Sequence, residues 1–215
     1  MSVKIILFDF DGTIADTFDA LVTITNRLAK DYRYKPATPE EIDHLRSLSS
    51  WEIFKRSGIS VFRLPSLLKR VQEDLHQYIH QLNPVSGIKE ALIELKAEGH
   101  TLGILTSNSQ ENVILFLKNH EMLELFSFIG SETTIFSKHR ILRRFIRKNR
   151  LIPDDVIYVG DETRDIEASK KIPIKIIAVS WGFNSKEALV KSHPDFLIHH
   201  PSELIEVMGT LQKVV

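Results

Sequence analysis

The sequence contains no cysteine among its 215 residues. Disulfide bonds, zinc sites built on thiolates and a cysteine nucleophile are therefore excluded. The absence fits a reducing compartment, where disulfide bonds are rare.

The chain also has no excess of charge of either sign. Lys and Arg number 28, Asp and Glu number 28, and the formal net charge is zero. A neutral chain gives no overall reason to bind nucleic acid or an anionic membrane. The basic residues of segment 138–150 could form a nucleic-acid patch, but their spacing favours the solvated face of an amphipathic helix, with a core side of Ile141, Leu142, Phe145 and Ile146. We therefore expect no nucleic-acid partner.

Long apolar runs are missing too. No run is long enough to cross a bilayer, and the short one that starts at Ile5 ends in aspartates, unlike a signal peptide. We expect a soluble, cytoplasmic protein with no membrane partner. Hydrophobic residues make up 43% of the chain, enough for one full core, or a core domain plus a small accessory domain.

Residues 14–83 have a helical pattern without convincing strands. Phe18, Leu21, Val22 and Thr25 recur at helical spacing. Pro84 then disfavours helix at the residue before it and marks a boundary.

Short apolar strands alternate with helices after this boundary. Strands are expected at 101–105, 128–129, 156–159, 176–179 and 196–198, in addition to the first strand, which begins at Ile5. Such alternation predicts an α/β fold with a doubly wound, Rossmann-like parallel sheet covered on both faces. The first strand belongs to this sheet, so residues 1–15 and 84–215 form the expected core, and residues 16–83 form a small, all-helical insert.

Polar side chains follow four of these segments, namely Asp9 and Asp11, Thr106, Lys138, and Asp161 with Asp165. The ends of strands in a doubly wound sheet share one edge, where ligands bind. Asp9 and Asp11 are one residue apart and start out on the same side of the chain. A divalent cation is the commonest way to offset two such like charges.

These residues resemble the four ordered motifs of the haloacid dehalogenase superfamily. The matching segments are Asp9-Phe10-Asp11-Gly12-Thr13, Leu105-Thr106-Ser107-Asn108, Lys138 and Gly160-Asp161-Glu162-Thr163-Arg164-Asp165. The helical insert is similar to the cap of the phosphoglycolate-phosphatase-like branch. The resemblance covers essentially the whole chain.

The resemblance implies a Mg²⁺-dependent phosphatase for a small phosphorylated metabolite. Asp9 would attack phosphorus and form an aspartyl-phosphate. Asp11 would protonate the leaving alkoxide and then activate water. The phosphate would be bound by Gly12, Thr106, Ser107 and Lys138.

The resemblance also implies a Mg²⁺ site formed by Asp9, Asp11 through its carbonyl, and Asp161. Asp165 would support the metal directly or through water, or orient Lys138. Dehalogenases of the same superfamily lack the second aspartate, so Asp11 favours phosphoryl transfer.

Several alternatives stay open. A phosphomutase would use the same motifs, and a regulatory, non-catalytic protein could keep the fold. Phosphoglycolate, sugar phosphates and nucleotides are all compatible with the motifs, and the oligomeric state is not specified.

In the insert, His76 and His80 have metal-ligand spacing without a third ligand, which favours a surface position. Arg46 and Trp51 fit substrate contact, and equally fit a surface Arg beside a buried Trp.

Overall fold

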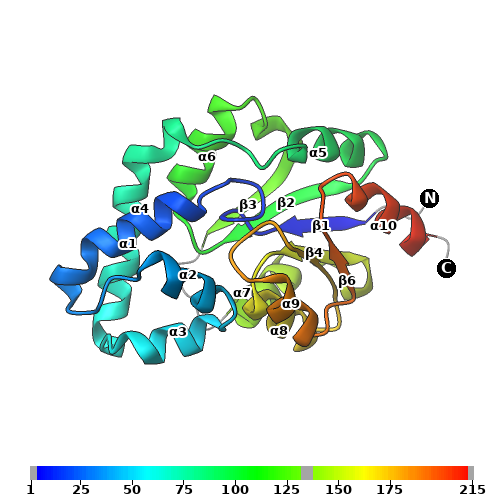
Figure 1. Ribbon diagram of the computed structural model, residues 1–215. Coiled ribbons are helices and arrows are strands. Elements are labelled where there is room, and N and C mark those ends of the chain that lie inside the picture. The colour runs from blue at the N-terminus through cyan, green and yellow to red at the C-terminus, as the bar shows by residue number, and fades with distance from the viewer. Residues whose placement is uncertain (1–3, 132–137, 213–215) are drawn as a thin grey trace.

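The computed structural model describes residues 4–131 and 138–212. The first three and last three residues assigned to the core lie outside the described residues, as do the residues directly before Lys138. Six parallel strands form one sheet in the order β3-β2-β1-β4-β5-β6 (Figure 1). The strands are β1 (Ile5–Phe8), β2 (Thr101–Thr106), β3 (Phe126–Ser131), β4 (Val156–Gly160), β5 (Lys175–Val179) and β6 (Phe196–Ile198).

The central strand β1 lies in register with a neighbour on each side. Ile5 pairs with Thr101 of β2 and with Val156 of β4. The chain builds outward from β1 to β3, then crosses back to β4, so the strand order reverses beside β1. Ligands bind in open α/β sheets at the carboxyl ends of strands at such a point.

Strand side chains alternate between two apolar layers. Ile6 and Phe8 belong to one core cluster, whereas Leu7 belongs to the other. Helices α5 (Ile88–Ala97), α6 (Gln110–Asn119) and α10 (Glu203–Gln212) cover the first face, and α7 (Lys138–Lys148), α8 (Thr163–Lys170) and α9 (Lys186–Lys191) cover the second (Figure 1). The predicted doubly wound α/β fold is confirmed.

Four further helices stand at the carboxyl end of the strands (Figure 1). They are α1 (Phe18–Tyr32), α2 (Pro39–Arg46), α3 (Ser50–Ser57) and α4 (Leu64–Tyr78). Short 3₁₀ turns lie in the same segment at η1 (Val61–Arg63) and η2 (Ile79–Gln81), and in the core at η3 (Leu123–Leu125) and η4 (Pro153–Asp155). An ion pair of 2.8 Å between Arg27 and the buried Asp74 joins α1 to α4. Thr38 and Ser49 begin α2 and α3 with complete capping boxes.

The two ends of this helical segment lie side by side. The amide of Asp16 donates to the carbonyl of Asn83 at 3.0 Å, and that of Val85 donates to the carbonyl of Ile14 at 2.9 Å. We propose the division between core and cap at this place. None of the helices in the described part of the chain has the length and apolar character that a bilayer crossing requires.

Candidate active site

Three buried carboxylates meet at the carboxyl ends of β1 and β4. Asp9 follows β1, Asp161 follows β4, and Asp165 lies in the first turn of α8. Their side chains each offer an oxygen atom, and these atoms all lie within 4.8 Å of one another. The three residues are only 2%, 0% and 0% exposed. Such a concentration of negative charge away from water requires cations.

Lys138 supplies one positive charge to this cluster. It begins α7, and its Nζ contacts both Asp9 Oδ2 and Asp165 Oδ1. Burial opposes the charge on Lys138, but Asp165 and Asp9 outweigh it and raise the pKa of the ammonium group. Burial raises the pKa of Asp165 to about 6, although Lys138 acts in the opposite direction.

Asp161 is held by partners on both of its oxygen atoms. The Thr13 hydroxyl donates to Oδ1 at 2.8 Å, and the Phe183 amide donates to Oδ2 at 2.6 Å. Burial, together with the neighbouring carboxylates Glu162, Asp9 and Asp165, raises the pKa of Asp161 well above its ordinary value. One lysine does not balance three carboxylates, and clustered carboxylate oxygens are ligands that Mg²⁺ accepts. The residues present therefore fit a divalent cation.

Asp11 lies outside the three-carboxylate group. Asn108 donates from Nδ2 to both of its carboxylate oxygens, at 3.1 Å each. Burial and the charge of Asp9 raise the pKa of Asp11 to about 7. A carboxyl group with such a pKa can donate a proton near neutral pH. Asn108 received no role from the sequence, although it directly follows Thr106 and Ser107.

Thr106 and Ser107 lie beside the same cluster. Thr106 is buried at the end of β2, and its hydroxyl accepts a hydrogen bond from the Asn108 amide at 3.0 Å. The Ser107 carbonyl accepts from Gln72 Nε2 of α4 at 2.6 Å. Together with Lys138, these residues line a small cavity. The structure thus places Thr106, the last residue of β2, and Ser107, which follows it, next to the predicted lysine.

Gly12 lies against Asp161. An added Cβ would be 2.4 Å from Asp161 Oδ2 and 2.5 Å from a ring carbon of Phe183, and the φ of Gly12 is +72°. A side chain at this position would therefore displace the carboxylate that we expect to hold the metal.

Replacement of Gly12 by Ala is expected to lower activity at least about 100-fold, because a shift of about 1 Å in the reacting groups is enough for such a loss. Gly58→Ala is the matched control, because Gly58 has a φ of +70° and nothing within 4 Å of an added Cβ. That control should lose about 1–2 kcal/mol of stability and keep its activity. Steady-state kinetics and denaturant unfolding of both variants test this, and equal activities would contradict it.

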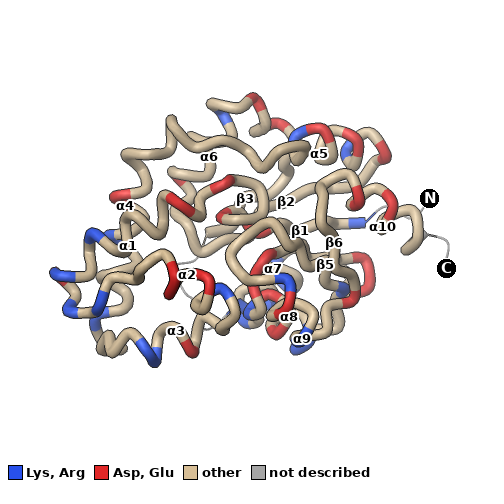
Figure 2. The backbone as a smooth tube through the Cα atoms, in the orientation of Figure 1, with Lys and Arg blue, Asp and Glu red and all other residues tan. Residues whose placement is uncertain are grey.

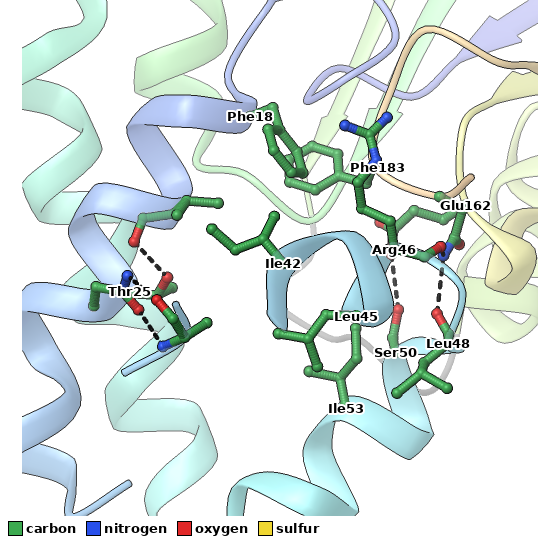
Figure 3. A pocket seen from close by; sticks show the side chains of 14 residues that line it. Phe18, Thr25, Ile42, Leu45, Arg46, Leu48, Ser50, Ile53, Glu162 and Phe183 are labelled. Carbon is green, nitrogen blue, oxygen red and sulfur yellow. Dashed lines mark hydrogen bonds between the residues drawn. The ribbon is translucent and has the colours of Figure 1, made fainter. Parts of the chain in front are cut away.

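The α2–α3 connection of the helical segment is docked on loops of the sheet. Asn184 Nδ2 donates to the carbonyls of Arg46 and Leu48 at 2.8 and 2.9 Å, and Arg46 NH2 donates to the Gly182 carbonyl at 2.9 Å. The Ser50 hydroxyl donates to Glu162 Oε2 at 2.7 Å. The adjoining apolar pocket has a volume of about 160 Å³, and Figure 3 shows Arg46, Ser50 and Glu162 along one side of it.

Arg46 and Trp51 differ in their surroundings. The Arg46 guanidinium lies 4.7 Å from the centre of the Phe18 ring, so this side chain is engaged by protein groups. Trp51 is 46% exposed and stacks on Phe54, so the alternative of a buried Trp is wrong.

His76 and His80 are engaged by α6. His76 Nδ1 lies 2.7 Å from Asn112 Oδ1, and His80 Nδ1 lies 2.9 Å from Asn119 Nδ2.

Basic and acidic residues are interspersed over most elements (Figure 2). Arg143 of α7 donates to the Lys171 carbonyl at 3.1 Å. The absence of a nucleic-acid partner stays a prediction.

Comparison with known proteins agrees with these features. The family model described as haloacid dehalogenase-like hydrolase matches residues 6–179. A phosphoglycolate phosphatase of Synechococcus elongatus is 37% identical over 211 residues, which cover 98% of this chain and 100% of that protein. The pyrophosphatase PpaX of Bacillus cereus is 23% identical over 220 residues, covering 99% and 100%. A haloacid dehalogenase-like hydrolase of Streptococcus pneumoniae has a similar fold, with a TM-score of 0.78, 21% identity and coverage of 96% and 98%.

Proposed function

Because the chain belongs to the haloacid dehalogenase-like hydrolases, we propose that it is a Mg²⁺-dependent phosphatase of a small phosphomonoester. The proposal is carried by one arrangement, in which the Asp9 carboxylate contacts Lys138 beside the carboxylates of Asp161 and Asp165. The proposed nucleophile, the proposed cation for the phosphate and the proposed metal ligands would thus act from one buried cluster.

Asp9 is the proposed nucleophile. The Phe10 amide donates to Asp9 Oδ1 at 2.8 Å, and Lys138 contacts Oδ2, so the carboxylate is oriented from both sides. One Asp9 oxygen would bond to phosphorus while the bond from phosphorus to the ester oxygen breaks. The product is an aspartyl-phosphate and an alcohol.

Asp11 is the proposed acid and base. It would give its proton to the departing ester oxygen, and as a carboxylate it would then take a proton from the water that attacks the aspartyl-phosphate. Its contact with Asn108 orients the carboxyl group without a positive charge. A pKa of about 7 is compatible with both tasks.

Thr106, the Ser107 amide, Lys138 and the backbone at Gly12 would bind the phosphoryl oxygens. Asp9, Asp161, Asp165 and the Asp11 carbonyl would hold Mg²⁺. When bound, the cation would supply the positive charge that lets a carboxylate approach an anionic phosphate. The docked cap would exclude bulk water from the site.

The similarity to a phosphoglycolate phosphatase supports 2-phosphoglycolate as the first substrate to test. Sugar phosphates are the second group, because the same motifs serve them.

Release of free phosphate distinguishes a phosphatase from a phosphomutase. With Mg²⁺ and 2-phosphoglycolate, we expect phosphate and glycolate in equal amounts. With glucose 1-phosphate, we expect any product to be glucose plus phosphate. Formation of glucose 6-phosphate without release of phosphate would establish a mutase, and no release from a wide panel of esters would revive the non-catalytic alternative.

A further inference from the structure

Arg164 is a largely buried cation that the proposed chemistry does not use. It lies in the first turn of α8, between Asp161 and Asp165 in the sequence, and its side chain is only 15% exposed. Its NH2 pairs with Glu162 Oε1 at 2.5 Å. Among the described residues, however, its buried Nε and NH1 have no hydrogen-bond acceptor. Buried donors without acceptors are costly, so an acceptor from outside this part of the chain is expected.

The Arg164 side chain borders two adjoining cavities. One is a small cavity of about 10 Å³ that Thr106, Ser107 and Lys138 also line. The other has a volume of about 580 Å³ and extends from Lys138 to Ser50 and Trp51 of the cap. Arg164 therefore lines the same two cavities as Lys138, the proposed phosphate ligand, and the larger of them reaches the cap.

The larger cavity has a cationic lining. Lys138, Arg164 and Lys171 contribute three positive charges, and Glu167 is the one carboxylate among the described lining residues. An excess of one sign in a partly enclosed space attracts ligands of the opposite sign.

Glu162 fixes the position of the guanidinium and connects it to the cap. One Glu162 oxygen accepts from Arg164 and the other from Ser50, at 2.7 Å. The Glu162 amide also donates to Asp165 Oδ2 at 3.1 Å. Arg164 is thus held in place by α8 and α3, with some of its donors still unpaired.

We propose that Arg164 is a specificity-determining residue that binds a second anionic group on the leaving portion of the substrate. The transferred phosphoryl group would already have Lys138, Thr106 and the metal. Of the other cations among the described lining residues, Lys138 is thus assigned to that group and Lys171 is exposed, which leaves Arg164 for a second charge. A carboxylate, as in 2-phosphoglycolate, or a second phosphate, as in pyrophosphate, supplies the same chemistry. This inference rests on the proposed phosphatase function.

The test is the ratio of kcat/KM between doubly anionic substrates and p-nitrophenyl phosphate. In Arg164→Gln we expect kcat/KM for 2-phosphoglycolate or pyrophosphate to fall about 10- to 100-fold, mainly through KM, as for a lost hydrogen bond between charged groups. The value for p-nitrophenyl phosphate should change less than about 3-fold, and Arg164→Lys should recover part of the loss. The substrate that loses more identifies the second anion as carboxylate or phosphate.

Two further variants separate recognition from folding. Arg140→Gln removes an exposed positive charge of α7. It should leave kcat/KM unchanged for the doubly anionic substrates and for p-nitrophenyl phosphate. Glu162→Gln combined with Arg164→Gln removes the buried pair together, so that no unpaired carboxylate remains, and should show the same selective loss with a thermal midpoint near that of the wild type.

An equal loss on all substrates, no loss on the doubly anionic ones, or a wild-type preference for esters of uncharged alcohols would each overturn the inference and leave the phosphatase proposal intact. A wild-type protein that releases phosphate from no ester would instead overturn both.

Discussion

Asp9→Asn is expected to lower kcat by at least about 10⁴-fold, because an amide cannot take the place of the attacking carboxylate. The fold should be unaffected. Asparagine has the same shape, and Lys138 keeps Asp165 as a partner. In the metal-free protein the thermal midpoint should even stay equal or rise, because one of three crowded carboxylates is removed.

Asp31→Asn is the matched control, since Asp31 is exposed on α1 and distant in sequence from every motif. Its kinetics should equal those of the wild type. Phosphate release assays and thermal melts of the two variants provide the comparison. A folded Asp9→Asn variant with substantial activity would show that this carboxylate is not the nucleophile.

Removal of divalent cations with EDTA is expected to abolish turnover without unfolding the protein, and Mg²⁺ should restore it. The reason is the surplus of negative charge, since the carboxylates of Asp9, Asp161, Glu162 and Asp165 share the two positive charges of Lys138 and Arg164. Binding to the folded state alone should stabilise it by about 2.7 kcal/mol at a Mg²⁺ concentration 100 times the Kd. Thermal melts with and without Mg²⁺ measure this directly.

Asp161→Asn is the variant that locates this effect. Asn keeps an acceptor for the Phe183 amide but removes the charge, so both the Mg²⁺-dependent rise in thermal midpoint and the activity should be lost. Full turnover in EDTA, or an unchanged response to Mg²⁺ in this variant, would be incompatible with the proposed metal site.

The site residues at the ends of the strands were predictable, because there an apolar run is followed directly by polar residues. Apolar runs gave β1 and β4, and the polar residues directly after them gave Asp9 and Asp161, which the structure brings together. Lys138 was predicted from the resemblance, together with its spacing ahead of Asp161 and the helix after it. It contacts two of these carboxylates.

Other parts of the site were not predictable, because their contacts carry no residue pattern. The Phe183 amide that holds Asp161 is a backbone group, which any residue would supply. Gly182 received no role from the sequence, yet an added Cβ would lie 2.2 Å from Asp161 Oδ2. Asn184 joins the core to the cap through backbone carbonyls 136 and 138 residues away in sequence.

The insert shows the same limit at the level of a domain. Its helices follow from apolar spacing and from the capping residues Thr38 and Ser49. The way in which α2 and α3 approach the sheet depends on Arg46 and Ser50 meeting Gly182 and Glu162, and such pairings cannot be read from one sequence. The cytoplasmic location stays a prediction.

The most direct test of the account is chemical trapping of the phosphorylated residue. The protein is mixed with Mg²⁺ and its best substrate, quenched during turnover and reduced with borohydride, which converts an aspartyl-phosphate to homoserine. Mass spectrometry of the peptides then locates the reduced residue. We predict that it is Asp9, with no reduction when substrate is omitted. Reduction or phosphorylation at another residue, with Asp9 unchanged, would contradict the account.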